Sequence, residues 1–229
     1  GNALDKEAAK KIYMAKGRPS DNPLIVHVAD ISEVSTYVKR ILPLEKRLME
    51  AFWPGPLTIV FPKKDIVPMA TSGGLRTIAI RCPAHEAARA LIRAAGVPIA
   101  GPSANFSTKP SPTYVGLEAT VIAVENGKLF IYRPGGITRD MLEAFAPTEL
   151  DTAITAEQEH PKAPGMKYRH YAPSAPLTVY AGNIEAVESE ILSFANKGKG
   201  KFGFFVSQET AEKIPAGNII FVWGRRGNK

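Results

Sequence analysis

Residues 77–100 read TIAIRCPAHEAARALIRAAGVPIA, and this stretch predicts a strand, a helix and a second strand in succession. The pattern of residues 77–82 is that of a buried strand. Residues 86–95 are rich in alanine and are followed by Gly96, which is typical of a helix and its end. Residues 98–100 predict a short strand. Alternating strands and helices indicate an α/β fold.

The same alternation extends on both sides of this stretch. The sequence predicts helices over residues 4–16, 31–40, 44–52 and 138–145, and strands over residues 24–28, 57–61, 120–124 and 129–132. Asn126 and Gly127 separate the last two strands, as in a β-hairpin.

The chain changes character after this region. Apolar periodicity fades over residues 146–175 and prolines recur, which indicates a long linker. Beyond it, the sequence predicts strands over residues 177–180, 201–206 and 219–223 and helices over residues 184–195 and 208–214. This order predicts a small parallel α/β domain.

The composition is that of a globular protein with an anionic partner. The 229 residues are 45% hydrophobic and 22% charged, so the chain can bury a core. The net charge of +7 favours a nucleotide or RNA, although basic surfaces are often only solvated. One cysteine excludes a disulfide scaffold and a cysteine-based zinc site. We expect a cytoplasmic protein with no membrane partner, because we find neither a spanning apolar run nor a signal peptide.

Two loops rich in small and polar residues are candidate ligand sites. Residues 16–24, KGRPSDNPL, place two cations, a hydroxyl and an amide between a helix and a strand. Such a loop can bind a triphosphate, and the alternative is an ordinary turn with exposed charges. The loop of residues 101–113 begins GPSANFS, and its small residues let a ligand approach backbone N–H groups. Ser103 lacks the GxSxG context of an acyl-enzyme serine, so a plain Ser/Pro-rich loop is favoured.

Four further places carry polar side chains at the ends of predicted strands or in the linker. Arg81 ends a core strand and needs a carboxylate, either from the protein or from a ligand. His27 lies near the end of another strand, and the four histidines lack the spacing of metal ligands. Arg133 begins a basic turn after a strand. Residues 167–171, KYRHY, could bind RNA or cover a nucleotide, or could be a solvated part of the linker.

Six strings, taken in order, resemble the YrdC-like L-threonylcarbamoyladenylate synthases in their long two-domain form. The strings are KGRPSDNPLIVHV at 16–28, FWPGPLTIV at 52–60, TIAIRCP at 77–83, GPSANFSTKPSPT at 101–113, RPGGIT at 133–138 and APGMKYRHYAP at 163–173. The resemblance covers residues 1–229. It implies an α/β fold with a twisted open mixed sheet in a catalytic domain (residues 1–146). A linker (147–176) that packs near the active site and a smaller Rossmann-like α/β domain (177–229) would follow.

The resemblance also implies the residues that bind substrates. ATP-binding positions are matched by Lys16, Arg18, Asn22, Thr77, Ser103, Ser111, Arg133 and Tyr171. Threonine-binding positions are matched by His27, Arg81, Gly101 and Ala119. Lys16 and Arg18 are the implied catalytic residues, because their charges can stabilise the phosphates and the leaving pyrophosphate, with Mg²⁺ bound through the phosphates of ATP rather than by protein side chains.

The implied reaction joins L-threonine, bicarbonate or CO₂, and ATP into threonylcarbamoyl-AMP and pyrophosphate. The product would pass to a transferase complex that forms N6-threonylcarbamoyladenosine at position 37 of tRNA. Two alternatives stay open: an RNA-binding module without its own catalysis, which the positive charge favours, and a carbamoyl-adenylate-forming module of hydrogenase maturation. The single cysteine argues against the latter, because those modules usually accompany zinc-finger-like cysteine motifs.

The sequence departs from the family pattern at several places. The family has a Thr/Tyr-rich string before the first helix and a longer stretch, including a helix, between Thr113 and Tyr114. A doubly wound domain also usually continues with a helix after a last strand such as the one here. We therefore expect segments beyond those given at all three places, with a true deletion after Thr113 as the alternative. The family string Glu-Ser-Thr-Val is Glu118-Ala119-Thr120-Val121 here, so a threonine-contacting serine is replaced by Ala119. Losing one hydroxyl removes about 0.5–1.5 kcal/mol of net hydrogen bonding.

Overall fold

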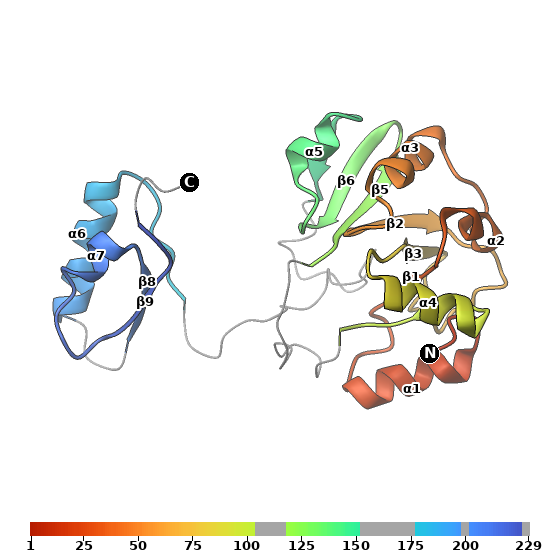
Figure 1. The fold of residues 1–229 in the computed structure, drawn as a ribbon, viewed down its shortest axis with the longest axis horizontal. Coiled ribbons are helices and arrows are strands. Elements are labelled where there is room, and N and C mark those ends of the chain that lie inside the picture. Colours follow the sequence, from red (N-terminus) through yellow and green to blue (C-terminus); the bar gives the residue numbers. More distant parts are fainter. Residues whose placement is uncertain (104–117, 152–176, 198–201, 226–229) are drawn as a thin grey trace. The chain divides into compact units, whose positions relative to one another are not determined.

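The computed structural model describes residues 1–103, 118–151, 177–197 and 202–225 (Figure 1). The chain divides into two compact units, Gly1–Ala172 and Pro173–Lys229. Each unit is described by itself below. Within the described residues, no helix is both long and apolar enough to cross a membrane.

The first unit is built on a mixed sheet whose strand order is β4-β1-β3-β2-β5-β6-β7. The strands are β1 (Ile25–His27), β2 (Leu57–Pro62), β3 (Thr77–Arg81), β4 (Ile99–Ala100), β5 (Thr120–Glu125), β6 (Lys128–Arg133) and β7 (Thr148–Leu150). The pairs β1–β3, β2–β5 and β6–β7 are parallel, and the other neighbours are antiparallel. This confirms the expected mixed α/β sheet.

One face of the sheet packs against most of the helices of this unit. The helical elements are α1 (Lys6–Lys16), η1 (Ile31–Glu33), α2 (Val34–Tyr37), α3 (Pro43–Phe52), α4 (Glu86–Ala95) and α5 (Arg139–Glu143). Alternation along β2 sends Leu57, Ile59 and Phe61 into the main core, where α3 contributes Leu48 and Met49. These five side chains are fully or almost fully buried, so this face anchors the fold.

The opposite face of the sheet is lined by smaller side chains. Val60, Ala79, Val121 and Ala123 form a separate buried cluster there, together with Tyr132. In each strand these residues alternate with the main-core residues, because successive side chains of a strand point to opposite faces. The strands therefore present small residues on the face that also includes His27 and Arg81.

Helices α1 and α4 end in the same way. The N–H of Gly17 donates to Met14 after α1, and the N–H of Gly96 donates to Arg93 after α4; both glycines are left-handed, with φ of 58° and 65°. At the start of α1, the Asp5 carboxylate accepts a hydrogen bond from the Glu7 N–H at 2.8 Å. These caps explain why both helices match the sequence prediction closely.

Several boundaries differ from the prediction. The expected helix 31–40 is a short 3₁₀ turn followed by a single turn of α-helix, η1 and α2. Strand β7 pairs with β6 at the start of the expected linker, and its three residues are too few to show periodicity. Residues 177–180 form no regular strand, although their side chains alternate in the sequence. The hairpin at Asn126 and Gly127 is confirmed, with both residues at positive φ.

The second unit contains two parallel strands and two helices among its described residues. They are α6 (Ile184–Lys197), β8 (Gly203–Val206), α7 (Gln208–Ala211) and β9 (Ile219–Val222), and β8 pairs with β9. Phe204, Val206 and Ile214 form its buried core with side chains from α6. The opposite sheet face exposes Phe205 and Phe221. The parallel pair agrees with the predicted parallel α/β domain, but the predicted helix 208–214 is shorter.

Candidate functional site

Three strands place polar side chains at one edge of the sheet. Strands β1, β3 and β6 run in the same direction, because β3 is antiparallel to β2, β2 is parallel to β5, and β5 is antiparallel to β6. Their last residues are His27, Arg81 and Arg133. The sheet therefore brings together three predicted ligand-binding residues that are far apart in the sequence.

Arg81 is fixed at this edge by the turn that precedes β2. Its Nε donates to the Gly55 carbonyl at 3.0 Å, and the Gly55 N–H donates to the Cys82 carbonyl at 2.9 Å. A Cβ on Gly55 would lie 2.1 Å from the Phe52 carbonyl oxygen, so only glycine fits this turn. Burial and the nearby Arg133 lower the pKa of Arg81, although its guanidinium stays charged. One side of the guanidinium is thus bound to the backbone and oriented by it.

His27 is the register partner of Arg81 and lies on the same face of the sheet. Burial, reinforced by the charge of Arg81, lowers the pKa of His27 from 6.5 to about 4. Its Nδ1 lies 3.3 Å from the Ile99 carbonyl oxygen. Because a carbonyl only accepts, this contact is a hydrogen bond when Nδ1 carries the proton, which leaves Nε2 as an acceptor. At neutral pH the site therefore contains an uncharged imidazole beside a charged guanidinium.

Arg133 lies against the segment that enters β5. Its Nη1 pairs with the Glu118 Oε2 at 2.8 Å, and its Nη2 donates to the Ala119 carbonyl at 2.8 Å. The following turn closes over the same segment, because the Gly136 N–H donates to the Glu118 carbonyl at 2.9 Å. A Cβ on Gly135 would lie 2.2 Å from that carbonyl oxygen. The two glycines of the RPGG string thus allow the backbone contact that positions Arg133.

The loop after α1 is organised by its own polar side chains. Arg18 donates from Nη2 to the Asn22 Oδ1 at 2.6 Å and to the Pro23 carbonyl at 2.8 Å. Asn22 is fully buried, and its Nδ2 has no hydrogen-bond partner among the described residues. Lys16 Nζ donates to the Ser103 carbonyl, which brings the loop after β4 next to the end of α1. Partial burial and the nearby Arg18 lower the pKa of Lys16.

The remaining predicted residues have different positions. Thr77 begins β3 opposite Pro62, at the other end of the strand from Arg81. The Gly101 N–H donates to the Ile25 carbonyl at 3.3 Å, and an added Cβ on Gly101 would lie 3.9 Å from His27 Nδ1. Ala119 is buried beside Arg133. Ser111 and Tyr171 lie outside the described residues, so their predicted roles stay predictions.

Two residues at the site were not predicted to act there. Glu118 pairs with Arg133, and the Gly55 carbonyl orients Arg81. Gly55 lies in the FWPGPLTIV string and Glu118 in the Glu-Ala-Thr-Val string. The position of Glu118 directly before Ala119, where the family has a threonine-contacting serine, was the sequence signal that could have indicated its role.

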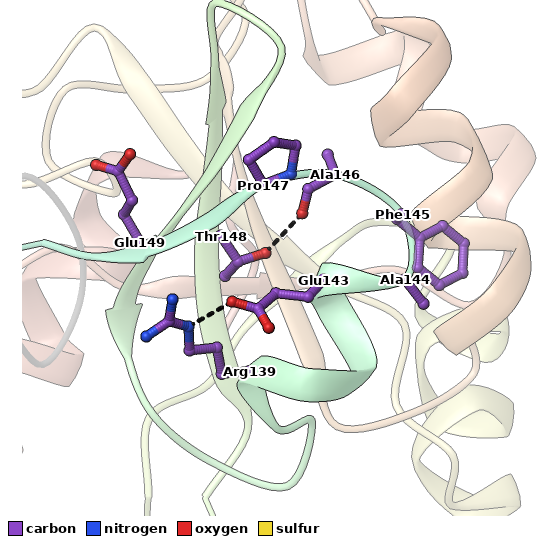
Figure 2. Close-up of a pocket in the computed structure, with 8 residues that line it drawn as sticks. All are labelled: Arg139, Glu143, Ala144, Phe145, Ala146, Pro147, Thr148 and Glu149. Carbon is purple, nitrogen blue, oxygen red and sulfur yellow. Dashed lines mark hydrogen bonds and ion pairs between the residues drawn. The ribbon is translucent and has the colours of Figure 1, made fainter.

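One cavity of the first unit lies between α5 and β7, and Figure 2 shows the residues that line it, Arg139 and residues 143–149. Its volume is about 510 Å³. Arg139 pairs with Glu143 at 2.7 Å, and the Thr148 hydroxyl donates to the Ala146 carbonyl at 2.9 Å. Glu149, which also lines the cavity, pairs with Lys128 outside it at 2.7 Å. None of the predicted site residues lines this cavity.

The described residues do not form a protein-based metal site. No group of three or more His, Cys, Asp or Glu side chains is placed to hold a metal ion in the part of the chain that the structure covers. Glu118 is paired with Arg133. The set of groups at the sheet edge thus fits an anion rather than a cation.

A mixed α/β sheet that places two arginines and a neutral histidine at the ends of three strands, together with a basic Gly/Pro loop, is an arrangement suited to binding anionic substrates. Residues 1–117 match the Sua5, YciO and YrdC family model, described as "Telomere recombination". Residues 137–229 match the model described as "Threonylcarbamoyl-AMP synthase, C-terminal domain". The chain belongs to this family of threonylcarbamoyl-AMP synthases, which are adenylyl-transferring enzymes, in the two-domain Sua5 form.

Individual relatives agree with this assignment. The threonylcarbamoyl-AMP synthase of Bacillus subtilis is 42% identical over 98% of this chain and 71% of the relative. The Schizosaccharomyces pombe synthase is 33% identical over 100% of this chain and 71% of the relative. The crystal structure of Pyrococcus abyssi Sua5 complexed with L-threonine is 34% identical, with a TM-score of 0.81 over 98% of this chain and 81% of that chain. The expected family and fold are thus confirmed.

Proposed function

We propose that the sheet edge formed by β1, β3 and β6 is where this enzyme converts L-threonine, bicarbonate or CO₂, and ATP into threonylcarbamoyl-AMP and pyrophosphate. The observation that supports this most directly is the pair of His27 and Arg81, a neutral imidazole beside an oriented guanidinium. A relative of the same fold was crystallised with L-threonine.

Threonine binds at the His27 and Arg81 end of the site in this proposal. A guanidinium can bind a carboxylate through two parallel hydrogen bonds, and Arg81 is already oriented by Gly55. Nε2 of His27 can accept a hydrogen bond from a hydroxyl or an ammonium group without adding a charge. Gly101 leaves room beside His27, and Ala119 lies beside Arg133. An amino acid with a side-chain hydroxyl matches this set of groups.

ATP binds to the more basic groups of the site. Lys16, Arg18 and Arg133 are the cations that would neutralise the phosphates, with Lys16 and Arg18 in the catalytic role because they stabilise the leaving pyrophosphate. The remaining nucleotide contacts are assigned to Asn22, Thr77, Ser103, Ser111 and Tyr171. Mg²⁺ would be bound through the phosphates of ATP.

The chemistry requires no covalent bond to the protein. The threonine amine attacks CO₂ and loses a proton, which gives a carbamate. A carbamate oxygen then attacks the α-phosphorus of ATP, and the bond to pyrophosphate breaks. The protein contributes by placing the reactants together, which can be worth roughly 7–11 kcal/mol, and by stabilising negative charge. Ser103 accordingly needs no base near it.

The product is proposed to pass to a tRNA threonylcarbamoyl transferase complex in the cytoplasm. A second candidate function is direct RNA binding, which the net charge of +7 favours. RNA binding that persists with saturating ATP would favour a separate RNA surface. Binding that ATP abolishes would favour one shared basic site.

The test is pyrophosphate release with threonine and bicarbonate omitted in turn. The proposal expects release only when ATP, threonine and bicarbonate are all present. Release without threonine would instead indicate ATP hydrolysis or carbamoyl-adenylate chemistry. A folded protein that binds ATP and releases no pyrophosphate would contradict the proposal.

A further inference from the structure

One carboxylate, that of Glu118, is paired with a cation at the sheet edge. Glu118 pairs with Arg133 at 2.8 Å, and both side chains are largely buried, with 32% and 19% of their surfaces exposed. The negative charge of Glu118 also raises the pKa of Lys16 and of Arg81, against the lowering that burial causes in both. Glu118 is therefore close enough to interact with cations from α1, β3 and β6.

These cations repel one another when no ligand is bound. Arg133 lowers the pKa of Arg81, and Arg18 lowers the pKa of Lys16, as expected for like charges that are close together. A carboxylate between them offsets part of this repulsion. A phosphate group would offset more of it, because it has more negative charge and more acceptor oxygens.

The backbone that follows Glu118 is held by hydrogen bonds. The Glu118 carbonyl accepts from the Gly136 N–H at 2.9 Å, and Gly135 packs so closely that a Cβ there would lie 2.2 Å from the same carbonyl oxygen. Two residues along, the Thr120 N–H donates to the Pro56 carbonyl at 2.9 Å, and its hydroxyl donates to the Ile137 carbonyl at 2.7 Å. A change of side-chain conformation at Glu118 could therefore move the carboxylate away from Arg133 while these backbone hydrogen bonds are kept.

We propose that the Glu118 carboxylate is an internal substitute for a substrate anion: it pairs with Arg133 and is displaced when a phosphate group binds. This inference rests on the proposed function and adds to it a residue that controls the affinity for ATP and pyrophosphate. Competition from Glu118 weakens the binding of ATP and of pyrophosphate. It therefore favours release of pyrophosphate after each turnover, at the cost of a higher KM for ATP.

The test measures the binding of ATP and of inorganic pyrophosphate by calorimetry to the full chain and to Glu118→Gln. Glutamine keeps the shape of the side chain and removes its charge. We expect about three- to tenfold tighter binding of both ligands to the variant, in line with the strength of partly exposed ion pairs. Equal or weaker binding would overturn the inference, because it would mean that Glu118 only orients Arg133.

Two further variants separate this effect from general changes in charge or folding. Glu149→Gln removes the same charge from an ion pair between Glu149 in β7 and Lys128 in β6, and it should leave both affinities unchanged. Glu118→Asp keeps the charge and should bind pyrophosphate no more tightly than the unmodified chain. Tight binding by Glu118→Asp would assign the effect to side-chain length and overturn the inference.

Steady-state kinetics gives an independent readout. Glu118→Gln should lower both the KM for ATP and the inhibition constant Ki for pyrophosphate as a product inhibitor. If Glu118 only oriented Arg133, its loss would raise both the KM and the Ki. If the unmodified chain binds neither ATP nor pyrophosphate, the proposed function fails. If it binds both and Glu118→Gln shows no gain, only the present inference fails.

Discussion

At the scale of single residues, the orientation of Arg81 leads us to predict how strongly its replacement affects the KM for threonine. Arg81→Lys keeps the positive charge but loses both the contact with Gly55 and the two-pronged binding of a carboxylate. Charged hydrogen bonds contribute about 1.5–3 kcal/mol each, so the KM for threonine should rise about tenfold or more. Initial rates of pyrophosphate release at varied threonine measure this.

A matched variant tests whether the effect belongs to the site. Arg76 is exposed just before β3, and Arg76→Lys makes the same chemical change outside the sheet edge. It should leave the KM for threonine unchanged. If Arg81→Lys and Arg76→Lys behave alike, then Arg81 does not bind the threonine carboxylate.

From the lowered pKa of His27 we predict how the stability of the first unit depends on pH. Its pKa is lowered from 6.5 to about 4 in the folded protein, so between these values the unfolded chain binds a proton that the folded chain does not. The free energy of unfolding should therefore fall as the pH drops through this window, by up to about 3 kcal/mol, and should be restored above pH 6.5.

Urea unfolding at pH 4.5 and 7 measures this loss through the fluorescence of Trp53, which is 6% exposed. Trp223→Phe in all variants removes the second tryptophan signal. His27→Gln should flatten the pH dependence, and the control His85→Gln should keep it. If the free energy of unfolding depends on pH equally in the two variants, His27 is not the titrating group.

The residue types of the site could be predicted from the sequence, but their pairings could not. Arg81 needed a partner, and the sequence left open whether a protein group or a ligand supplies it. The structure gives a backbone partner, Gly55, whose carbonyl has no sequence signature. Glu118 went unrecognised because its pairing with Arg133 depends on how β5 and β6 are registered, which includes a bulge after Val121.

At the scale of elements, the end of α1 links local backbone geometry to nucleotide binding. Gly17 has φ of 58° and lies between Lys16 and Arg18. Gly17→Ala meets no steric clash, but a side chain in the left-handed region costs about 1–2 kcal/mol. We expect that loss of stability in urea unfolding, together with a higher KM for ATP because the flanking cations shift.

Gly96 provides the matched control for this substitution. It ends α4 with φ of 65° and equally open space around its Cβ position, and it is not among the predicted site residues. Gly96→Ala should therefore destabilise the chain by a similar amount without changing the KM for ATP. An unchanged KM in Gly17→Ala as well would argue against a role for this loop in nucleotide binding.

Elements with strong local signals were predictable, and those defined by tertiary contact were not. Helix α4 has an N-cap and a left-handed glycine, and its observed bounds match the prediction. Strand β7 is recognisable only through its pairing with β6. Residues 177–180 alternate in the sequence like a strand, but they form no strand in the structure. Alternation predicts a strand only where a neighbouring strand is available for hydrogen bonding.

At the scale of the whole molecule, the two units differ in how much core supports their strands. The first unit has a seven-stranded sheet and an extensive buried core. Among its described residues, the second unit has a two-stranded sheet with three buried core residues, and it exposes 74% of Phe205 and 60% of Phe221. Two parallel strands with one open apolar face form a marginal structure.

We therefore predict that the second unit of this 229-residue chain opens at a lower free energy than the first. Native-state hydrogen exchange followed by mass spectrometry should show the amides of β8 and β9 exchanging well before those of β2 and β3. Mild urea should accelerate exchange in the second unit first, because less buried surface resists its opening. Equal protection of β8 and β9 and of β2 and β3 would mean that the two units unfold together. The prediction that the second unit is less stable would then be wrong.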